Sequence, residues 1–367
     1  MLKDELEERQ SVLIEAMRFP LIVLVVFIHI LPGYLVPLHF DLSGMNVYHV
    51  ISEILSHSIG RMAVPCFFLF SGFFFFRKLE VWSSRFYFTQ LRKRVMTLLL
   101  PYFLWNMVMI MTICIKQYIF SLLSLESKED GIFDIHNQSW FELFWLGPVN
   151  FPLWYLRDLI CMSLLAPAFY YIFRYLKIWG LLLLVILYLT TLSIPVKGMS
   201  MTALLFFGIG AYCGIYKENL LRICLKLKKV CAIGALFFLC CATYNHGGEL
   251  YELFIRPFIL FGMVTAINLM NSVINRPFWK KRLCSLSATV FFIYAVHEIY
   301  IINWTKGFFS RTSLIETTGG LMLAYILIPI ITVTVCLLLY FLLNNTVPRL
   351  LAFTIGGRVS TKLSGGK

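Results

Sequence analysis

Long apolar runs, separated by short polar segments, constrain this chain more than any other feature of its sequence. A helix that crosses a lipid bilayer needs about 20 mostly apolar residues. Ten candidate runs occur, at about 13–36, 49–76, 95–120, 152–173, 177–195, 199–216, 229–244, 250–273, 284–304 and 318–345. Only 14% of the 367 residues are charged, whereas soluble domains carry about 25%. We therefore predict an all-α, polytopic membrane protein with about ten transmembrane helices.

The lysines and arginines alternate along the chain in a way that predicts the orientation of these helices. Loops that stay in the cytoplasm carry an excess of basic residues. The N-terminal segment and every second segment after it together hold 23 of the 32 Lys and Arg residues, and the intervening loops hold five. Both termini are therefore predicted to be cytoplasmic, as short tails over 1–12 and 346–367 that flank one membrane domain over 13–345. The longest loop, at about 121–151, is acidic and is predicted to lie outside.

The net charge of +13 and the ten cysteines both have simple interpretations in a membrane protein. A strongly basic chain can bind nucleic acid. Here the positive charge lies at the ends of apolar runs, so we predict contact with membrane lipids and no nucleic-acid partner. The cysteines contain no CxxC pair, and most of them fall inside apolar runs. We interpret them as small core residues and predict neither a disulfide framework nor a metal site.

The first apolar run contains three side chains that are costly to place in lipid, namely Glu15, Arg18 and His29. Each helical residue advances by about 100° and rises by about 1.5 Å. Arg18 and His29, eleven residues apart, therefore lie on one helix face, about 16 Å apart along the axis. Glu15, three residues before Arg18, is within reach of an ion pair with it. The alternatives are a structural Glu–Arg pair with a satisfied core histidine, or a functional face that points into the protein.

Further candidates lie in the second and third runs. Arg61 is another intramembrane cation, and a buried cation needs an anion. Ser71 precedes Gly72, and such small residues favour close helix packing. Arg92 and Arg94 belong to a basic cluster at the predicted cytoplasmic mouth. This cluster suits either anionic lipid or a phosphate-bearing ligand.

The remaining candidates are expected near the outer face. Trp154 and Tyr155 open the fourth run, where aromatic residues usually form an interfacial belt but can also stack on sugars. His297 lies in the ninth run and is followed by Glu298. Since adjacent helical positions diverge by about 100°, Glu298 need not touch His297. His29 and His297 are thus the two histidines predicted in the outer half of the membrane.

Taken in order, these motifs resemble those of the acyltransferase 3 family of integral-membrane acyltransferases, over nearly the whole chain. The most specific motif is an acid, then Arg, ten residues and His, here Glu15, Arg18 and His29. The others are Arg61-x-x-x-Pro65-x-Phe-Phe-x-x-Ser71-Gly72, a basic stretch from Arg94 to Pro101-Tyr102, Leu153-Trp154-Tyr155-Leu156, and Tyr294-x-x-His297. One departure is Thr97, which stands where many members carry a second arginine.

The resemblance implies transfer of an acyl group, commonly acetyl, from cytoplasmic acyl-CoA to a hydroxyl of a cell-surface or lipid-linked glycan. It makes 13–345 the acyltransferase domain of an enzyme of the inner (plasma) membrane, with acetyl-CoA as donor substrate and no tightly bound cofactor. The implied catalytic residues are His29, Arg18 and Glu15, with His29 preferred as general base over a covalent acyl carrier. The implied binding residues are Arg61, Arg94, Arg92, Trp154, Tyr155, His297 and Ser71.

Two other classes of protein share some of these features. A polytopic transporter or flippase for a polar or anionic substrate also uses intramembrane charge. It would predict internal inverted repeats, and none is evident in the sequence. A membrane scaffold or sensor would leave the aligned face of Arg18 and His29 unexplained.

Overall fold

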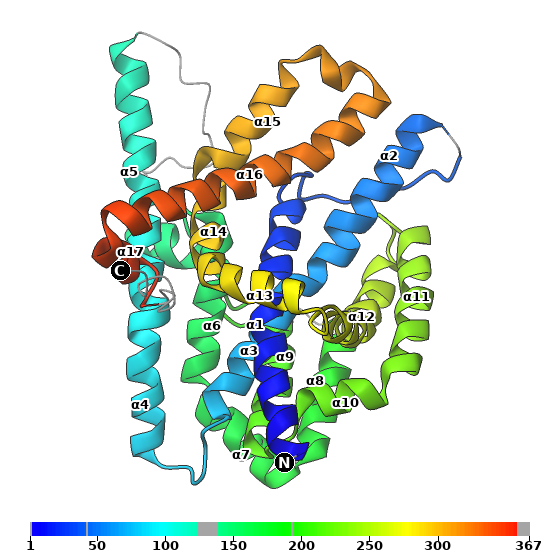
Figure 1. Cartoon of the computed structure of the whole chain (residues 1–367), viewed down its shortest axis with the longest axis vertical. Coiled ribbons are helices and arrows are strands. Elements are labelled where there is room, and N and C mark those ends of the chain that lie inside the picture. The colour runs from blue at the N-terminus through cyan, green and yellow to red at the C-terminus, as the bar shows by residue number, and fades with distance from the viewer. Residues whose placement is uncertain (1, 42, 124–137, 192–193, 358–367) are drawn as a thin grey trace.

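The structure is a computed structural model that describes residues 2–41, 43–123, 138–191 and 194–357, and every regular element in these ranges is helical (Figure 1). The α-helices are α1 (Leu2–Ile28), α2 (Gly44–Glu53), α3 (Ala63–Phe76), α4 (Ser84–Arg94), α5 (Leu100–Leu122), α6 (Trp154–Leu164), α7 (Ala166–Leu176), α8 (Ile178–Leu189), α9 (Met201–Ile215), α10 (Leu220–Lys226), α11 (Lys228–Tyr244), α12 (Tyr251–Val273), α13 (Pro277–Leu286), α14 (Val290–Val296), α15 (Ile302–Ser310), α16 (Thr318–Thr346) and α17 (Pro348–Thr354). Short π-helical or 3-10 segments are η1 (Ile54–Ile59), η2 (Gly60–Met62), η3 (Val95–Leu99), η4 (Glu142–Leu146), η5 (Phe151–Leu153), η6 (Ser287–Thr289), η7 (His297–Ile301) and η8 (Ser313–Glu316). The all-α prediction is confirmed.

Within the described ranges, the helices that could cross a membrane are fewer than predicted. Six are long and apolar enough: Glu5–Ile28, Gly44–Phe76, Ser84–Leu122, Tyr251–Val273, Pro277–Ser310 and Thr318–Thr346. Phe151–Leu164 and Ala166–Leu176 qualify only as one span bent by 56°, and Pro167, which lacks an N–H, starts the second half. The fifth and sixth runs form helices of only 12 and 15 residues. The count of ten spans is therefore not confirmed, although the architecture is consistent with a polytopic membrane protein.

Helix α1 lies at the centre of the bundle (Figure 1) and packs against α3, α12, α13, α14 and α16. The side chains of Leu13, Met17, Leu21 and Val25 are buried along its length. Because its neighbours come from both halves of the chain, side chains on α1 meet residues that are hundreds of positions away in sequence. The packing of α1 thus decides which later residues face Arg18 and His29.

Helices α3 and α9 approach so closely that both need glycine at the contact. A Cβ atom on Gly72 would lie 2.1 Å from the carbonyl oxygen of Phe207, and one on Gly210 would lie 2.0 Å from that of Leu69. Any larger residue would force the two backbones apart. Gly72 therefore has the packing role that the sequence indicated, whereas Ser71 beside it lines the cavity described below.

The segment Pro277–Ser310 contains an irregular turn at η7. Ile299 (φ −73°, ψ 75°) and Tyr300 (φ 60°, ψ −17°) leave the helical conformation there. A positive φ is uncommon for a residue other than glycine, and such conformations cluster at functional sites. The backbone stays helical through His297, so the irregular turn directly follows the two residues His297 and Glu298.

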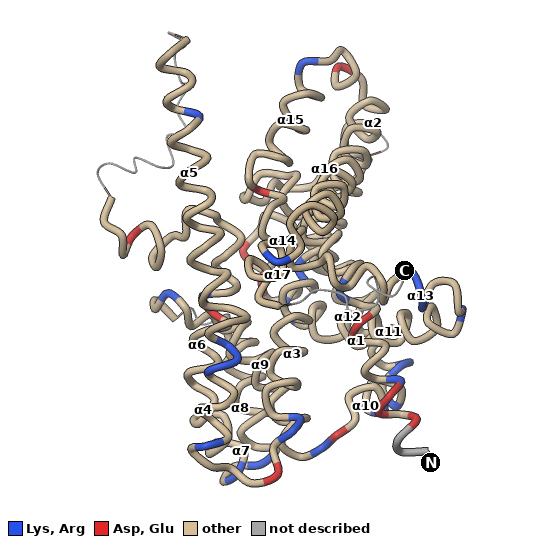
Figure 2. The backbone as a smooth tube through the Cα atoms, turned by 60° about the vertical axis from the view of Figure 1, so that its left-hand side comes forward, with Lys and Arg blue, Asp and Glu red and all other residues tan. Residues whose placement is uncertain are grey.

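Basic residues gather toward one end of the molecule (Figure 2). The α3–α4 link, the α7–α8 turn and α10 lie at the same end as the N-terminus, while the far end of α5 and the α15–α16 link lie at the other (Figure 1). Two other basic segments, on α13 and near α17, lie closer to mid-height in the same view, so the separation matches only part of the predicted alternation (Figure 1). Which end faces the cytoplasm stays a prediction, and residues 124–137 of the predicted outer loop lie outside the described ranges.

Candidate active site

A cavity of about 350 Å³ lies between α1, α3, the α4–η3 junction, α6 and the segment from η6 to α14. Its polar lining consists of Arg18, Ser71, Arg94, Thr97, Tyr155, Ser287 and Tyr294. Most of the remaining lining is aliphatic or aromatic, including Ile22 and Val25 of α1. Four of the residues singled out in the sequence, Arg18, Ser71, Arg94 and Tyr155, therefore meet around one space.

Two guanidinium groups dominate the electrostatics of this cavity. The Cζ atom of Arg18 lies 5.9 Å from the ring centroid of Phe74, and that of Arg94 lies 5.7 Å from the centroid of Phe75. Arg94 also donates a hydrogen bond from Nη2 to the backbone oxygen of Ser71, at 3.2 Å. Among the described residues, neither arginine forms an ion pair with a carboxylate. Cations in a largely apolar space are costly without a counter-ion, so this cavity suits a ligand that carries phosphate.

Glu15 does not form the ion pair that its spacing predicted. Its side chain is exposed, and its Oε1 accepts a hydrogen bond from Ser287 Oγ at 3.3 Å. In the part of the chain that the structure describes, no ion pair joins Glu15 to Arg18. The spacing made the pair reachable, but the packing of η6 against α1 supplies Glu15 with another partner, and Arg18 turns toward Phe74 and the cavity. Arg18 is thus available to a ligand.

His29 follows the last residue of α1 and meets Glu298 from η7. The His29 Nδ1 atom lies 2.7 Å from Glu298 Oε1, and the two side chains are 15% and 23% exposed. Because an ionised carboxylate only accepts hydrogen bonds, this contact assigns the proton to Nδ1 and the lone pair to Nε2. Lys306 Nζ also donates to the backbone oxygen of His29, at 2.8 Å. A histidine oriented by a carboxylate in this way is suited to act as a general base.

His297 lies beside His29, with the two ring centroids 5.2 Å apart. It is fully buried. Its Nδ1 atom lies 3.0 Å and 2.9 Å from the carbonyl oxygens of Ile293 and Tyr294, so the proton on Nδ1 is donated there. Its Nε2 atom has no hydrogen-bond partner among the described atoms. The second histidine therefore supplies an unused lone pair next to the pair formed by His29 and Glu298.

The cavity lies close to both histidines, because α1 and α14 line it and His29 and His297 directly follow these two helices. Val25, about one helical turn before His29, and Tyr294, three residues before His297, both line the cavity. Helix α1 is continuous to Ile28. The axial distance from Arg18 to His29 is therefore close to that of a regular helix, about 16 Å. The arrangement thus places an arginine-lined cavity about one turn from a histidine–carboxylate pair.

Three other sequence candidates lie away from this cavity. Arg61 Nη1 forms an ion pair with Glu252 Oε1 at 2.8 Å, and Glu252 also holds Arg256 at 3.1 Å. The anion that Arg61 requires is therefore a protein carboxylate. Arg92 is exposed on α4 and Trp154 is half-buried at the start of α6, and neither lines the cavity.

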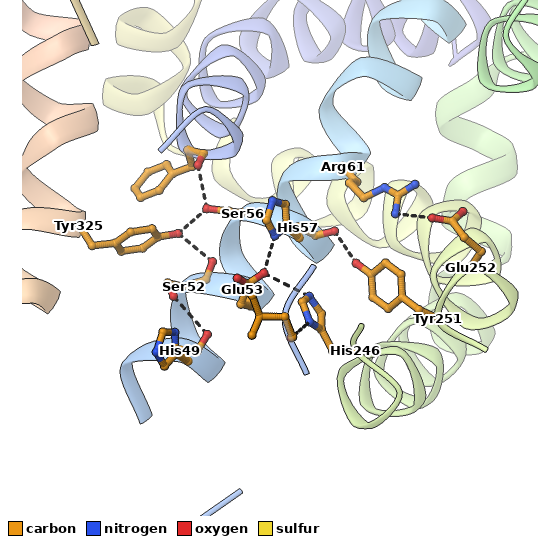
Figure 3. A network of polar contacts seen from close by, with 12 residues as sticks. His49, Ser52, Glu53, Ser56, His57, Arg61, His246, Tyr251, Glu252 and Tyr325 are labelled. Atoms are coloured by element: carbon orange, nitrogen blue, oxygen red, sulfur yellow. Dashed lines mark hydrogen bonds and ion pairs between the residues drawn. The ribbon is translucent and has the colours of Figure 1, made fainter. Parts of the chain in front are cut away.

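Sequence reasoning missed Glu298 as the partner of His29, although an intramembrane carboxylate is itself a signal of function. It also missed a second group of three side chains, Glu53, His57 and His246 (Figure 3). The first group is His29, His297 and Glu298. In both groups, the atoms that could bind a metal lie within 4.8 Å of one another. Each group joins elements that are far apart in the chain, which no local pattern shows.

The chain matches a protein family and is similar to a protein of polysaccharide biosynthesis. A family model described as an acyltransferase domain matches residues 12–341. The succinoglycan biosynthesis protein ExoH of Rhizobium meliloti (strain 1021) is 24% identical over 372 residues, which cover 96% of this chain and 94% of that protein. No solved structure gives a significant match.

Proposed function

Because this chain belongs to the acyltransferase 3 family, we propose that it transfers an acyl group from acyl-CoA to a hydroxyl group of a glycan. The family membership supports acyl transfer, and the similarity to a protein of succinoglycan biosynthesis supports a glycan acceptor. The observation that carries the proposal is the contact between His29 and Glu298 beside a cavity with two arginines, neither of which forms an ion pair with a carboxylate of the described residues.

The cavity is assigned to the acyl-CoA donor, with acetyl as the expected acyl group. Arg18 and Arg94 bind phosphate oxygens, for which guanidinium groups are well suited. The cavity of about 350 Å³ is assigned to the pantetheine arm of the donor. The nucleotide therefore stays at the mouth, where the exposed Arg92 and Lys93 precede Arg94. The thioester then extends along α1 toward His29.

His29 acts as the general base in this mechanism. Its Nε2 atom takes the proton of the glycan hydroxyl while the hydroxyl oxygen attacks the thioester carbonyl carbon. The new C–O bond forms, the C–S bond breaks, and the proton passes to the departing sulfur, leaving an ester and the free CoA thiol. Glu298 orients the ring and stabilises the imidazolium that forms. His297, which is fully buried beside His29, packs against the ring of the base and holds its position.

The proposed location is the plasma membrane, with the arginine end of the cavity toward the cytoplasm. The positive-inside distribution of basic residues supports this orientation, since Arg94 lies in one of the most basic segments. The donor enters from the side that holds acyl-CoA. The acceptor, a cell-surface or lipid-linked glycan, approaches the histidines from the other side.

The test uses membranes with and without the protein, supplied with radiolabelled acetyl-CoA or succinyl-CoA and the glycan fraction of the source cells. We expect label in the glycan and one equivalent of free CoA thiol released per acyl group transferred. Glycan movement across the membrane without thioester consumption would indicate the transporter class instead. Failure of both donors to label any glycan would contradict the proposal.

A further inference from the structure

A second histidine–carboxylate group lies apart from the candidate active site, where α2 and η1 meet the turn between α11 and α12 (Figure 3). Glu53, His57 and His246 are only 4%, 7% and 4% exposed. The Oε2 atom of Glu53 contacts His57 Nδ1 and lies 3.2 Å from His246 Nε2. Three side chains that can each ligate a metal are thus collected in one sealed space.

The hydrogen bonding of His246 leaves one of its nitrogens unused. Its Nδ1 atom lies 2.8 Å from the backbone oxygen of Val36, which can only accept, so the proton on Nδ1 is donated there. Its Nε2 atom points toward Glu53 at ion-pair distance yet makes no hydrogen bond. A carboxylate facing this nitrogen requires a positive charge between them, either a proton on Nε2 or a metal ion. Donation from the other ring nitrogen to a carbonyl is typical of metal-bound histidine.

Contacts from neighbouring residues hold this group in place. Tyr251 donates from its hydroxyl to the backbone oxygen of His57 at 2.8 Å, and its ring lies 5.0 Å from that of His246. Ser56 Oγ donates to the backbone oxygen of Phe27 at 2.7 Å, which ties η1 to the end of α1 two residues before His29. Such outer contacts orient first-sphere ligands in metal sites.

We propose that Glu53, His57 and His246 bind one Zn²⁺ ion. Two histidine nitrogens and one carboxylate oxygen form an established zinc ligand set, with bonds of about 2.0–2.2 Å. Tetrahedral bonds of this length place ligand atoms about 3.3 Å apart, close to the 3.2 Å between Glu53 and His246. The shorter contact between Glu53 and His57 opens when the ion enters, and water takes the fourth position.

The burial of the group makes this a structural ion. A substrate has no route to side chains that are less than a tenth exposed. The ion instead joins the segment that contains Val36, the α2–η1 segment and the α11–α12 turn. The site is independent of the proposed acyl transfer, because none of its ligands lines the donor cavity.

The test measures metal in the full-length protein, purified in detergent through a tag without histidine and without chelators. We expect about one zinc per chain by mass spectrometry of the metal. His246→Asn removes the Nε2 ligand while its amide still reaches Val36, and Glu53→Gln keeps the shape of the carboxylate. Both should lose most of the zinc. His49→Asn, an exposed histidine on α2, and Glu298→Gln should keep it.

A second measurement uses the wild-type protein, so that the test does not depend on whether the variants fold. Wild-type protein stripped with a chelator should take up Co²⁺ with a visible absorption band and an increase in Tm, and Zn²⁺ should displace the Co²⁺. Wild-type protein that binds neither ion would overturn the proposal. So would zinc that persists in folded His246→Asn, or zinc lost from Glu298→Gln alone, which would place the ion beside His29.

Discussion

The two histidine–carboxylate groups of this protein contain the same kinds of side chain but differ in their surroundings. His29 and Glu298 are 15% and 23% exposed and lie about one turn from an arginine-lined cavity. Glu53 and His57 are 6% and 9% exposed, and His246 is 1% exposed, measured on side chains alone. The difference in exposure is the physical basis of the two proposed roles. An imidazole next to a cavity is placed to exchange a proton with a substrate, whereas the buried imidazoles are assigned a structural role.

The backbone explains why one group is open and the other closed. Glu53 ends α2 and His57 lies four residues later in the π-helical η1, so one continuous helical segment carries both. Neighbouring helices cover them. His29 instead lies just beyond the end of α1, and Glu298 lies in an irregular turn. Ends and irregular turns leave space that a continuous helix would fill.

The largest expected loss of activity is in the open group, which we define as His29 and Glu298. Replacing His29 with alanine removes the proposed base, and acyl transfer should fall by about 10²–10⁴-fold at an unchanged protein level. The measurement is the initial rate of label transfer from acyl-CoA to glycan in membranes, with His49→Ala as the control. His297→Ala should keep partial activity. If His297→Ala were the more damaging change at equal expression, His297 would be the base.

A matched pair of carboxylate substitutions separates the two groups directly. Glu298→Gln should lower kcat by about 10²-fold or more, because the amide no longer favours the required tautomer or stabilises the imidazolium. Glu53→Gln should leave kcat of the folded enzyme nearly unchanged and lower its stability by about 3 kcal/mol, the usual cost of breaking a buried pair. Rates and thermal unfolding are measured on the same preparations. Equal rate losses in both variants would show that the two groups act as one site.

The third prediction concerns the cavity that makes the open group different. Arg94→Ala should raise KM for acyl-CoA by about 10- to 100-fold, the value of a lost charge-assisted hydrogen bond of about 1.5–3 kcal/mol. Arg92→Ala, which changes an exposed residue two positions away, should alter KM only slightly. Competition by free CoA checks the assignment, since its affinity should fall with Arg94→Ala alone. An unchanged KM for Arg94→Ala would remove the cavity from the donor site.

The smallest effect is expected at Arg61, which lies in neither group. Its partner Glu252 keeps a second ion pair with Arg256, so Arg61→Ala leaves no unpaired carboxylate. The rate and KM should change by no more than about a factor of two to three, as for a change of about 0.5 kcal/mol. A large increase in KM for acyl-CoA would instead restore Arg61 to the donor site.

The sequence predicted much of this architecture because the relevant signals are local. Apolar runs and helical periodicity located the segments that became helices. The spacing of Arg18 and His29 predicted one shared helix face, whereas the structure ends α1 at Ile28, just before His29. The motif order was sufficient to identify the family. Gly72 was correctly assigned to packing, since small residues next to apolar ones mark close helix contacts.

Only the tertiary structure decided the partners of the charged and polar side chains. The packing of α1 against later helices gave Glu15 a contact with Ser287 and turned Arg18 into the cavity. The packing of α1 beside α14 and η7 brought Glu298 to His29. The bend between α6 and α7 and the short α8 and α9 reduced the number of full-length spans. These outcomes depend on contacts between residues that are far apart in the chain. A local sequence pattern can show that a buried charge needs a partner, but it cannot show which residue is that partner.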